Sequence, residues 1–328
     1  MALNIITPGP LSLIQDLGRF GYQSIGVSPG GPMDEHAFRW ANRLLDNDPN
    51  AAQIEVTMGQ FSCEFTAETC FSITGADMGA MLNAKAIAPW HTYVAKAGDK
   101  LSLRGARSGM RSYLALKGGF KLPAPLGSCA TVMRDQLGGA SGLGEKLKAG
   151  DRLDYGGHSR TTHSLSRSVP YYFIPHYSQK VTLEVIPSYQ YDEFTPEQSE
   201  RFFGSTYTLT PQMDRMGARL AGEAIECKRN NLISEGIALG SIQIPPDGQP
   251  IILLRDRQTI GGYPKIGCVT VKSLNRLAQC LPGAEIRFVE KDPLQAQIER
   301  RTELLFFHAY VGKGSKKQGV SKVQDTDK

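Results

Sequence analysis

The chain has 328 residues, enough for two domains or one large one, and its 41% hydrophobic and 21% charged content is typical of soluble globular proteins. It has 37 basic and 32 acidic residues, and the Lys and Arg outside its C-terminal tail are scattered without interleaved aromatics. This pattern argues against a nucleic-acid-binding protein. The lack of any apolar run near about 18 residues argues against a membrane-spanning one.

The cysteines and the N-terminal residues indicate the cellular compartment in which the protein works. The six cysteines form no C-x-x-C pair and most have apolar neighbours, so we expect free thiols in a reducing compartment. The first residues carry neither the basic region nor the long apolar region of a secretory signal. The six histidines show no metal-ligand spacing. We therefore predict a cytoplasmic protein with no metal ligand set of its own.

The first half of the chain predicts many short strands and one helix. Residues 3–27 alternate between apolar segments and turns that contain Gly and Pro. A helix is predicted from about 33 to 45, because Pro32 suits a first helical turn and the acidic pair after Met33 favours the positive end of the helix dipole. Short apolar segments between 53 and 120, separated by Gly turns, are typical of a barrel or a sandwich.

The second half also predicts strands, with a capped helix after Thr195 and a final helix after Asp292. A polar stretch separates it from the first half. The predicted fold class is mainly β with a few helices, arranged as two β-barrel-like domains. The predicted segments are a β-rich domain over residues 1–155, a linker over 156–178, a barrel domain over 179–311 and a disordered tail over 312–328.

Residues 234–269 concentrate turn signals and polar side chains around one short apolar run, Ile251–Leu254. The run predicts a buried strand with a turn at each end, which would bring Asp247 and Lys265 together from its two ends. Turns on a rigid β scaffold commonly carry binding residues. Taken singly, each polar residue fits ordinary surface solvation or a structural salt bridge. The candidate site residues are Asp247, Gln249, Arg257, Gln258, Thr259, Gly261, Gly262, Tyr263 and Lys265, with Arg215 and Arg219 from the preceding turn.

Two familiar catalytic motifs are excluded. Residues 26–30 match G-x-S-x-G, but the residue after Ser28 is Pro29, which has no N–H to donate to an oxyanion hole. A plain turn is the better interpretation. The sequence also contains no G-x-x-x-x-G-K-[ST] motif, so it has no recognisable P-loop for a nucleoside triphosphate.

Three long segments resemble a known family: TPGPLSLIQDLGRFGYQSIGVSPGGPMDEHAFRWAN, DRMGARLAG and GSIQIPPDGQPIILLRDRQTIGGYPKIG. They are similar to allophanate hydrolase subunit 2, the biotin-dependent carboxyltransferase-like family that includes the C subunit of bacterial ATP-dependent 5-oxoprolinase. The resemblance extends from about Thr7 to about Leu305. Arg255, Ile260 and Gly267 depart from the family pattern, which bears on substrate preference and not on membership.

The resemblance implies a fold, partners and a reaction. The implied fold is two β-rich domains with cyclophilin-like barrel character. The implied partners are the B subunit of the family, which resembles a kinase inhibitor, and the lactam-utilisation protein that serves as its A subunit, in cytoplasmic nitrogen metabolism. The implied reaction is the ATP-driven opening of 5-oxo-L-proline to L-glutamate. Two alternatives stay open: the carboxyltransferase subunit of a biotin-dependent urea or amide carboxylase, and a non-catalytic regulator that binds a kinase inhibitor.

Amide chemistry suggests roles for the candidate residues. Attack on a lactam or urea builds charge on oxygen, which Lys265 and Arg257 can stabilise, with Asp247 as a base or orienting group. The remaining candidates would bind substrate. ATP would be handled by a partner protein, and any biotin would come from a partner because the chain has no Met-Lys attachment sequence. We expect the chain to be inactive without its partners.

Overall fold

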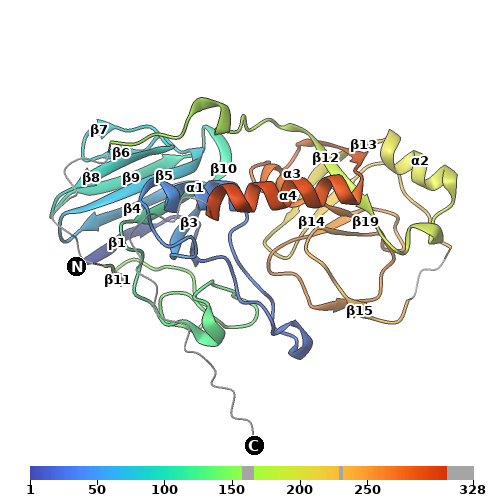
Figure 1. The fold of residues 1–328 in the computed structure, drawn as a ribbon, viewed down its shortest axis with the longest axis horizontal. Coiled ribbons are helices and arrows are strands. Elements are labelled where there is room, and N and C mark those ends of the chain that lie inside the picture. Colours follow the sequence, from blue (N-terminus) through green and yellow to red (C-terminus); the bar gives the residue numbers. More distant parts are fainter. Residues whose placement is uncertain (157–165, 229–231, 309–328) are drawn as a thin grey trace, which may run out of the picture.

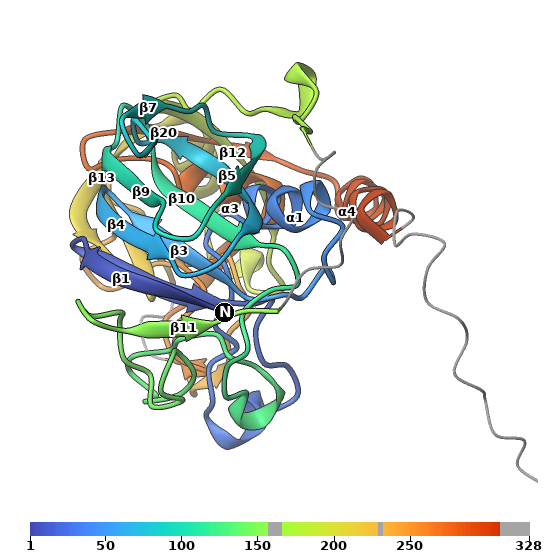
Figure 2. The same cartoon turned by 90° about the vertical axis from the view of Figure 1, so that its left-hand side faces the viewer.

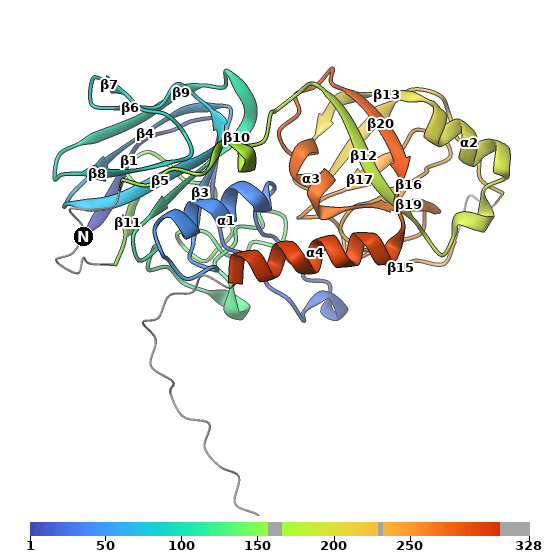
Figure 3. The ribbon, with the colours of Figure 1, turned by 45° about the horizontal axis from the view of Figure 1, so that its top comes forward.

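The computed structural model describes residues 1–156, 166–228 and 232–308. Two β-rich halves lie side by side, and two helices lie near their junction (Figure 1). Helix α1 (Glu35–Leu44) belongs to the first half. Helix α4 (Pro293–His308) follows the last strand of the second half and extends toward α1 (Figure 3). No helix among the described residues is long and apolar enough to cross a membrane.

The first half consists of two antiparallel sheets with a shared core. Leu3, Phe61 and Leu103 from one sheet pack with Ile54 and Leu114 from the other. The six-stranded sheet has the order β11 (Arg152–Asp154), β1 (Ala2–Pro8), β4 (Gly59–Phe65), β9 (Lys100–Gly105), β6 (Met81–Leu82) and β7 (Lys85–Ala86). The five-stranded sheet has the order β2 (Leu11–Gln15), β3 (Gln53–Thr57), β10 (Ser108–Leu116), β5 (Thr69–Asp77) and β8 (His91–Ala95).

Helix α1 covers the outer face of the five-stranded sheet beside β5 and β10 (Figure 2). Asp34 caps the helix by accepting a hydrogen bond from the backbone N–H of Ala37 at 3.0 Å. On the covered face of β5, Ser72 and Thr74 donate to carbonyl oxygens of α1 at 2.8 and 2.7 Å. These bonds satisfy hydroxyls that would otherwise be buried alone. The predicted helix is confirmed, with its start two residues later than expected.

The second half is a closed seven-stranded barrel. Strands β12 and β20 pair in parallel and close it, while its other pairs are antiparallel. The barrel interior is apolar and includes Leu183, Leu209, Leu220, Ile242 and Ile252. In order around the barrel, the strands are β12 (Lys180–Pro187), β19 (Lys265–Val269), β16 (Ser241–Gln243), β17 (Ile251–Leu253), β14 (Gly217–Ala221), β13 (Thr206–Met213) and β20 (Glu285–Glu290).

Shorter elements decorate the barrel. Helix α3 (Val271–Leu277) follows β19, and α2 (Pro196–Gly204) begins after the predicted cap Thr195, which accepts from Gln198 N. A two-stranded sheet of β15 (Glu235–Gly236) and β18 (Ile260–Gly261) lies outside the seven strands. The predicted strand over 251–254 is confirmed as β17, with a turn before it at 245–248.

The mainly β fold class is confirmed, and the second half is the predicted barrel. The first half has the sandwich form, because its sheets remain two separate sheets. Residues 166–178 of the predicted linker pack on the first half: Val169 donates to Trp90 O at 2.9 Å, and the His36 ring bonds to Phe173 O at 2.8 Å. The remainder of that linker from 157 to 165, and the predicted tail, lie outside the described residues.

Nearly buried ion pairs connect the two halves. The Arg215 guanidinium, in the turn between β13 and β14, binds both oxygens of Asp256 at 2.8 and 2.9 Å. It also reaches across the junction to Glu55 on β3, at 2.7 Å. The exposed fractions of the Arg215 and Glu55 side chains are 8% and 1%. Because a buried charge without its partner is costly, this pair favours one relative orientation of the halves.

Glu35, at the start of α1, forms a second ionic connection. Its Oε1 lies 2.6 Å from Arg39 and 2.6 Å from Arg300 of α4, and its Oε2 lies 2.9 Å from Arg255. Burial alone would raise the pKa of Glu35, but the three guanidinium groups outweigh burial and hold that pKa well below its usual range. The carboxylate is therefore ionised at neutral pH and can serve all three cations.

An amide side chain completes the junction. Gln279, just after α3, accepts from the backbone N–H groups of Met110 and Arg111 at 2.8 Å each. Its Nε2 donates to Asp34 at 2.8 Å, so the residue that caps α1 is also tied to the barrel half. The two halves therefore share hydrogen bonds as well as ion pairs.

Replacing Arg215 by Met tests the junction. The substitution leaves Glu55 and Asp256 buried without their shared cation, and we expect the free energy of unfolding to fall by about 3–5 kcal/mol. Urea unfolding followed by circular dichroism measures the change. The matched control is Lys180→Met, which removes an ion pair to Glu285 whose side chains are 77% and 46% exposed. That control should cost less than about 1 kcal/mol. Equal small losses in both variants would contradict this account of the junction.

Candidate functional site

The predicted site residues occupy three places on the barrel half. One group surrounds Lys265, at the start of β19. A second surrounds the ion pair of Asp247 with Arg219, near the start of β17. The third, Arg215, Arg257 and Thr259, is buried near the junction. The first two groups lie on the outer surface of the barrel, since their neighbours in sequence along the strands, such as Ile266 and Leu220, point into the core.

Lys265 is a buried lysine with a carboxylate partner. Its side chain is 4% exposed, and its Nζ lies 2.6 Å from Glu235 of β15 and 3.3 Å from the carbonyl oxygen of Tyr263. Gln190 accepts from the backbone N–H of Lys265 at 2.8 Å and donates to the same Glu235 carboxylate. Glu235 and Gln190 were not among the sequence candidates, although they complete the hydrogen bonding of this group.

The Glu235 carboxylate stays ionised beside the lysine. Partial burial tends to raise the pKa of Glu235, but hydrogen bonds from Lys265 and Tyr189 outweigh burial and lower that pKa. The Glu235 side chain is 32% exposed, so the pair is open to solvent on the carboxylate side and closed on the ammonium side. A ligand would therefore approach this ion pair past Glu235.

Gln243 of β16 is the cross-strand neighbour of Lys265. Its side chain is buried, and its Nε2 has no hydrogen-bond partner among the described residues. A Cβ at Gly261 would lie 2.9 Å from this Nε2 and 2.7 Å from Ile237 Cδ1, so the glycine allows the β18 backbone to approach the amide. A buried donor without an acceptor is costly, and an oxygen from a ligand would relieve that cost.

Asp247 forms a separate group in the turn before β17. Its Oδ2 lies 2.7 Å from Arg219 of β14, with both side chains partly exposed. The side-chain amide of Gln249 bonds to the backbone N–H and C=O of Gly222 at 2.8 and 3.2 Å. Beside this group is a hollow of about 440 Å³ that Arg219, Ile251 and the turn between β13 and β14 line. Arg219 is therefore the cation at the edge of an open hollow.

Strand register fixes the separation of the two outer groups. Lys265 pairs with Gln243, Gln243 with Ile251, and Ile251 with Arg219. Three strand spacings separate the Cα atoms of Lys265 and Arg219, which places them about 14 Å apart. The expected meeting of Asp247 with Lys265 is therefore wrong: each has its own partner, because β16 lies between β17 and β19.

The buried group is occupied by structural contacts. The Arg257 guanidinium donates to Ile237 O at 3.1 Å and Leu254 O at 3.3 Å. Burial, with repulsion from Arg255 second, lowers the pKa of Arg257 to about 10. These bonds join the segment that follows β15 to the segment that leads to β18. Arg215 is held at the junction by the Glu55 and Asp256 carboxylates, so we place both arginines behind the outer surface.

A loop of the first half reaches these two segments. In Figure 1 the blue loop that carries η1 (Gln23–Ile25) extends toward the barrel half near β15. Gln23 Nε2 donates to Ile237 O at 3.0 Å, and Ser28 Oγ donates to Arg257 O at 2.8 Å. Ser28, of the rejected G-x-S-x-G motif, is buried in this contact. It thus connects the two halves, a role that the interpretation as a plain turn missed.

The described residues contain no group of three or more His, Cys, Asp or Glu side chains arranged to hold a metal ion. The chemistry that the outer groups offer is electrostatic. A buried ammonium, a free amide donor and a guanidinium can each bind a carbonyl or carboxylate oxygen. Neither outer group contains a nucleophilic thiol.

Comparison with known proteins identifies the family. The carboxyltransferase domain model, subdomain A and B, matches residues 25–290. The chain is 36% identical to the C subunit of 5-oxoprolinase from Escherichia coli, over 93% of this chain and 96% of the relative. It is 38% identical to the C subunit of 5-oxoprolinase from Haemophilus influenzae, over 92% of this chain and 96% of the relative.

A solved structure agrees with this placement. The urea carboxylase of Kluyveromyces lactis superposes with a TM-score of 0.88 at 28% identity, and the match covers 95% of this chain. The same match covers 29% of the urea carboxylase chain. The described fold is therefore one part of that larger protein, and nearly the whole of the two bacterial subunits.

Gly262→Ala tests how closely the outer layer must pack. A Cβ at Gly262 would lie 2.7 Å from Leu232 O, while Leu232 N donates to Gly262 O at 3.1 Å. The two backbones must separate, and we expect the free energy of unfolding to fall by about 1–3 kcal/mol. Gly236→Ala, in the adjacent strand β15 with open space at its Cβ, is the control and should lie within about 1 kcal/mol of wild type. Urea unfolding of both variants checks this, and equal losses would refute it.

Proposed function

The chain belongs to the carboxyltransferase family with subdomains A and B, and we propose that it is the C subunit of an ATP-dependent 5-oxoprolinase complex. In that complex it would take part in opening 5-oxo-L-proline to L-glutamate. The amide bond of the lactam is hydrolysed, and ATP hydrolysis supplies the driving force. We propose that two further proteins complete the complex, the kinase-inhibitor-like partner and the lactam-utilisation partner that the sequence suggested.

The observation that carries this proposal is the extent of the match. The chain covers 96% of the C subunit of each bacterial 5-oxoprolinase, whereas it covers 29% of the urea carboxylase chain. A protein that has the whole length of a relative and about a third of its residues identical is a good candidate for the same task.

The outer face of the barrel offers suitable chemistry. When the lactam carbon is attacked, negative charge grows on its carbonyl oxygen, and fixed donors lower the energy of that charge. We assign the Lys265 ammonium and the Gln243 amide to that oxygen. Glu235 and Gln190 would hold the lysine in place. Arg219, oriented by Asp247 beside the separate hollow, would bind a carboxylate of a partner protein or of a second ligand, since a planar guanidinium suits a carboxylate.

ATP and biotin are assigned to partners and not to this chain. The sequence has no P-loop and no Met-Lys biotin attachment sequence. ATP would therefore act on a partner protein, and this chain would contribute Lys265 to the shared site. We propose that the isolated chain is inactive for that reason.

The alternative activity is that of a carboxyltransferase in a biotin-dependent urea or amide carboxylase. The TM-score of 0.88 to urea carboxylase favours it, and urea is also an amide whose oxygen gains charge when it reacts. The same donors would serve either substrate. An assay that compares 5-oxo-L-proline with urea as substrate therefore distinguishes the two activities.

The direct test mixes the purified chain with its two partner proteins, ATP and 5-oxo-L-proline and measures glutamate. We expect glutamate release that requires ATP and every component. Turnover of urea with biotin and bicarbonate in place of 5-oxoproline would favour the carboxylase instead. Absence of both activities from a fully assembled complex would refute the catalytic proposal and favour a regulatory role.

Replacing Lys265 by Met should lower kcat/KM of the assembled complex about 100-fold or more, because one fixed donor to a developing oxyanion contributes on that scale. The control is Lys180→Met, on the barrel but in an exposed ion pair, which should keep wild-type activity. Circular dichroism of both variants verifies folding. Full activity of the Lys265 variant would remove this residue from the proposed site.

A further inference from the structure

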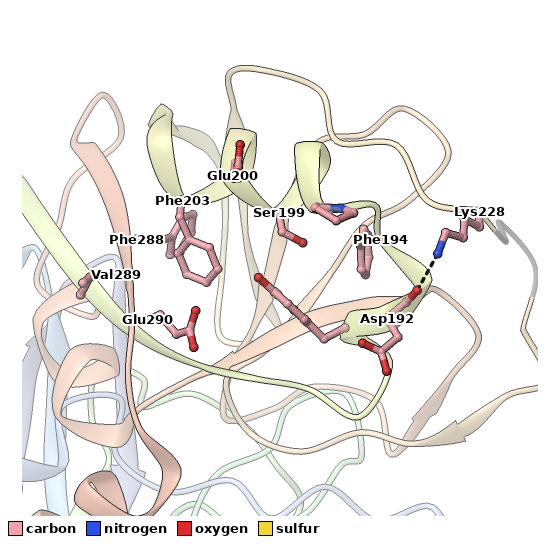
Figure 4. Close-up of a pocket in the computed structure, with 11 residues that line it drawn as sticks. Asp192, Phe194, Ser199, Glu200, Phe203, Lys228, Phe288, Val289 and Glu290 are labelled. Carbon is pink, nitrogen blue, oxygen red and sulfur yellow. Dashed lines mark hydrogen bonds between the residues drawn. The ribbon is translucent and has the colours of Figure 1, made fainter.

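A groove of about 790 Å³ lies on the barrel half, apart from the proposed site (Figure 4). Helix α2, η5 (Tyr191–Glu193) and the end of β20 form its walls. Figure 1 shows α2 at the end of the molecule that is farthest from the first half. The groove is therefore available to another molecule without disturbing the junction.

The floor of the groove is aromatic and firmly packed. Phe288 stacks on Phe202 with ring centroids 4.4 Å apart, and Phe203 meets Phe202 edge to face at 5.0 Å. Phe194, at the other side of the floor, is buried. Phe194 and Phe288 are themselves buried, so the half-buried Phe203 and the exposed Val289 supply most of the apolar surface that a ligand would meet. Because the ring of Phe203 is held by its neighbours, it binds an apolar group with little loss of side-chain entropy.

The rim of the groove is acidic. Asp192 of η5, Glu200 of α2 and Glu290 of β20 are exposed, and the described part of the chain contains no ion pair to any of them. The nearby Lys228 ammonium donates to the backbone carbonyl of Asp192 at 2.8 Å. Among the described residues that line the groove, three carboxylates and one ammonium leave two net negative charges, in a chain whose formal charge is +5. The groove is thus a local exception to the charge of the molecule.

We propose that this groove docks a segment of a partner protein in which two Lys or Arg side chains flank apolar ones. The three carboxylates lie on different sides of the aromatic floor in Figure 4, so one ammonium group could not reach them all. Two basic side chains can each meet a carboxylate while their aliphatic stems lie over the rings. The apolar residues between them bind the floor.

The groove also adjoins the proposed site through the chain. Tyr191, in its wall, directly follows Gln190, whose amide contacts Lys265 N and Glu235. A docked segment would thus contact the short helix that directly follows Gln190. The docking proposal itself does not depend on the substrate, so it can be tested without the reaction.

Peptide binding to the full-length chain tests the proposal. The probes are two fluorescein-labelled peptides, LKLSLKL and its charge-reversed form LELSLEL. Fluorescence anisotropy at low ionic strength measures the affinity of the chain for each peptide. We expect the lysine peptide to bind at least about tenfold more tightly than the glutamate peptide. The double variant Glu200→Gln/Glu290→Gln should weaken the lysine peptide about tenfold, because two favourable charge contacts are lost.

The control is Glu197→Gln/Glu223→Gln, which removes two exposed carboxylates outside the groove and should change the affinity less than about twofold. Three results would overturn the proposal: no binding of the lysine peptide, equal binding of both peptides, or equal weakening by the groove and control variants. Inactivity towards 5-oxoproline would leave these outcomes unchanged, so failure of the proposed reaction is distinguishable from failure of the docking proposal.

Discussion

The ion pair between Arg215 and Glu55 is the interaction on which the rest of the structure depends. Both side chains are nearly buried, so neither charge is tolerable without the other, and they come from different halves of the chain. With the barrel oriented in this way, the loop that carries Ser28 reaches the segment before β18. The outer layer that contains Lys265 is thus supported by the first half, although every side chain of that group comes from the second.

The residues that stabilise the fold differ from those that could bind a ligand. Arg257 donates its hydrogen bonds to backbone carbonyls, and Arg215 pairs with buried carboxylates. Lys265 and Arg219 lie on the outer face of the barrel and have partly exposed acidic partners. An exposed carboxylate can release its cation to a substrate at modest cost, and a buried one cannot. The proposed amide chemistry therefore belongs to the outer pairs, at a surface that a partner protein could cover.

The sequence allowed the prediction of local features and missed features that depend on distant contacts. The apolar run at Ile251 and the Thr195 cap predicted β17 and α2 because neighbours in sequence determine both. Glu235 was missed because it stands alone in a two-residue strand, and its meeting with Lys265 depends on the register of the barrel.

The central claim is that the buried pairs make the two halves one cooperative unit. Hydrogen exchange in a series of urea concentrations, detected by mass spectrometry, measures the protection of backbone amides in each half separately. Peptides from β10 report on the first half and peptides from β14 on the second. The account predicts that both lose protection at the same urea concentration in the wild-type chain, because neither half retains its buried charges alone. Two well-separated midpoints would show that the halves unfold independently and would contradict the account.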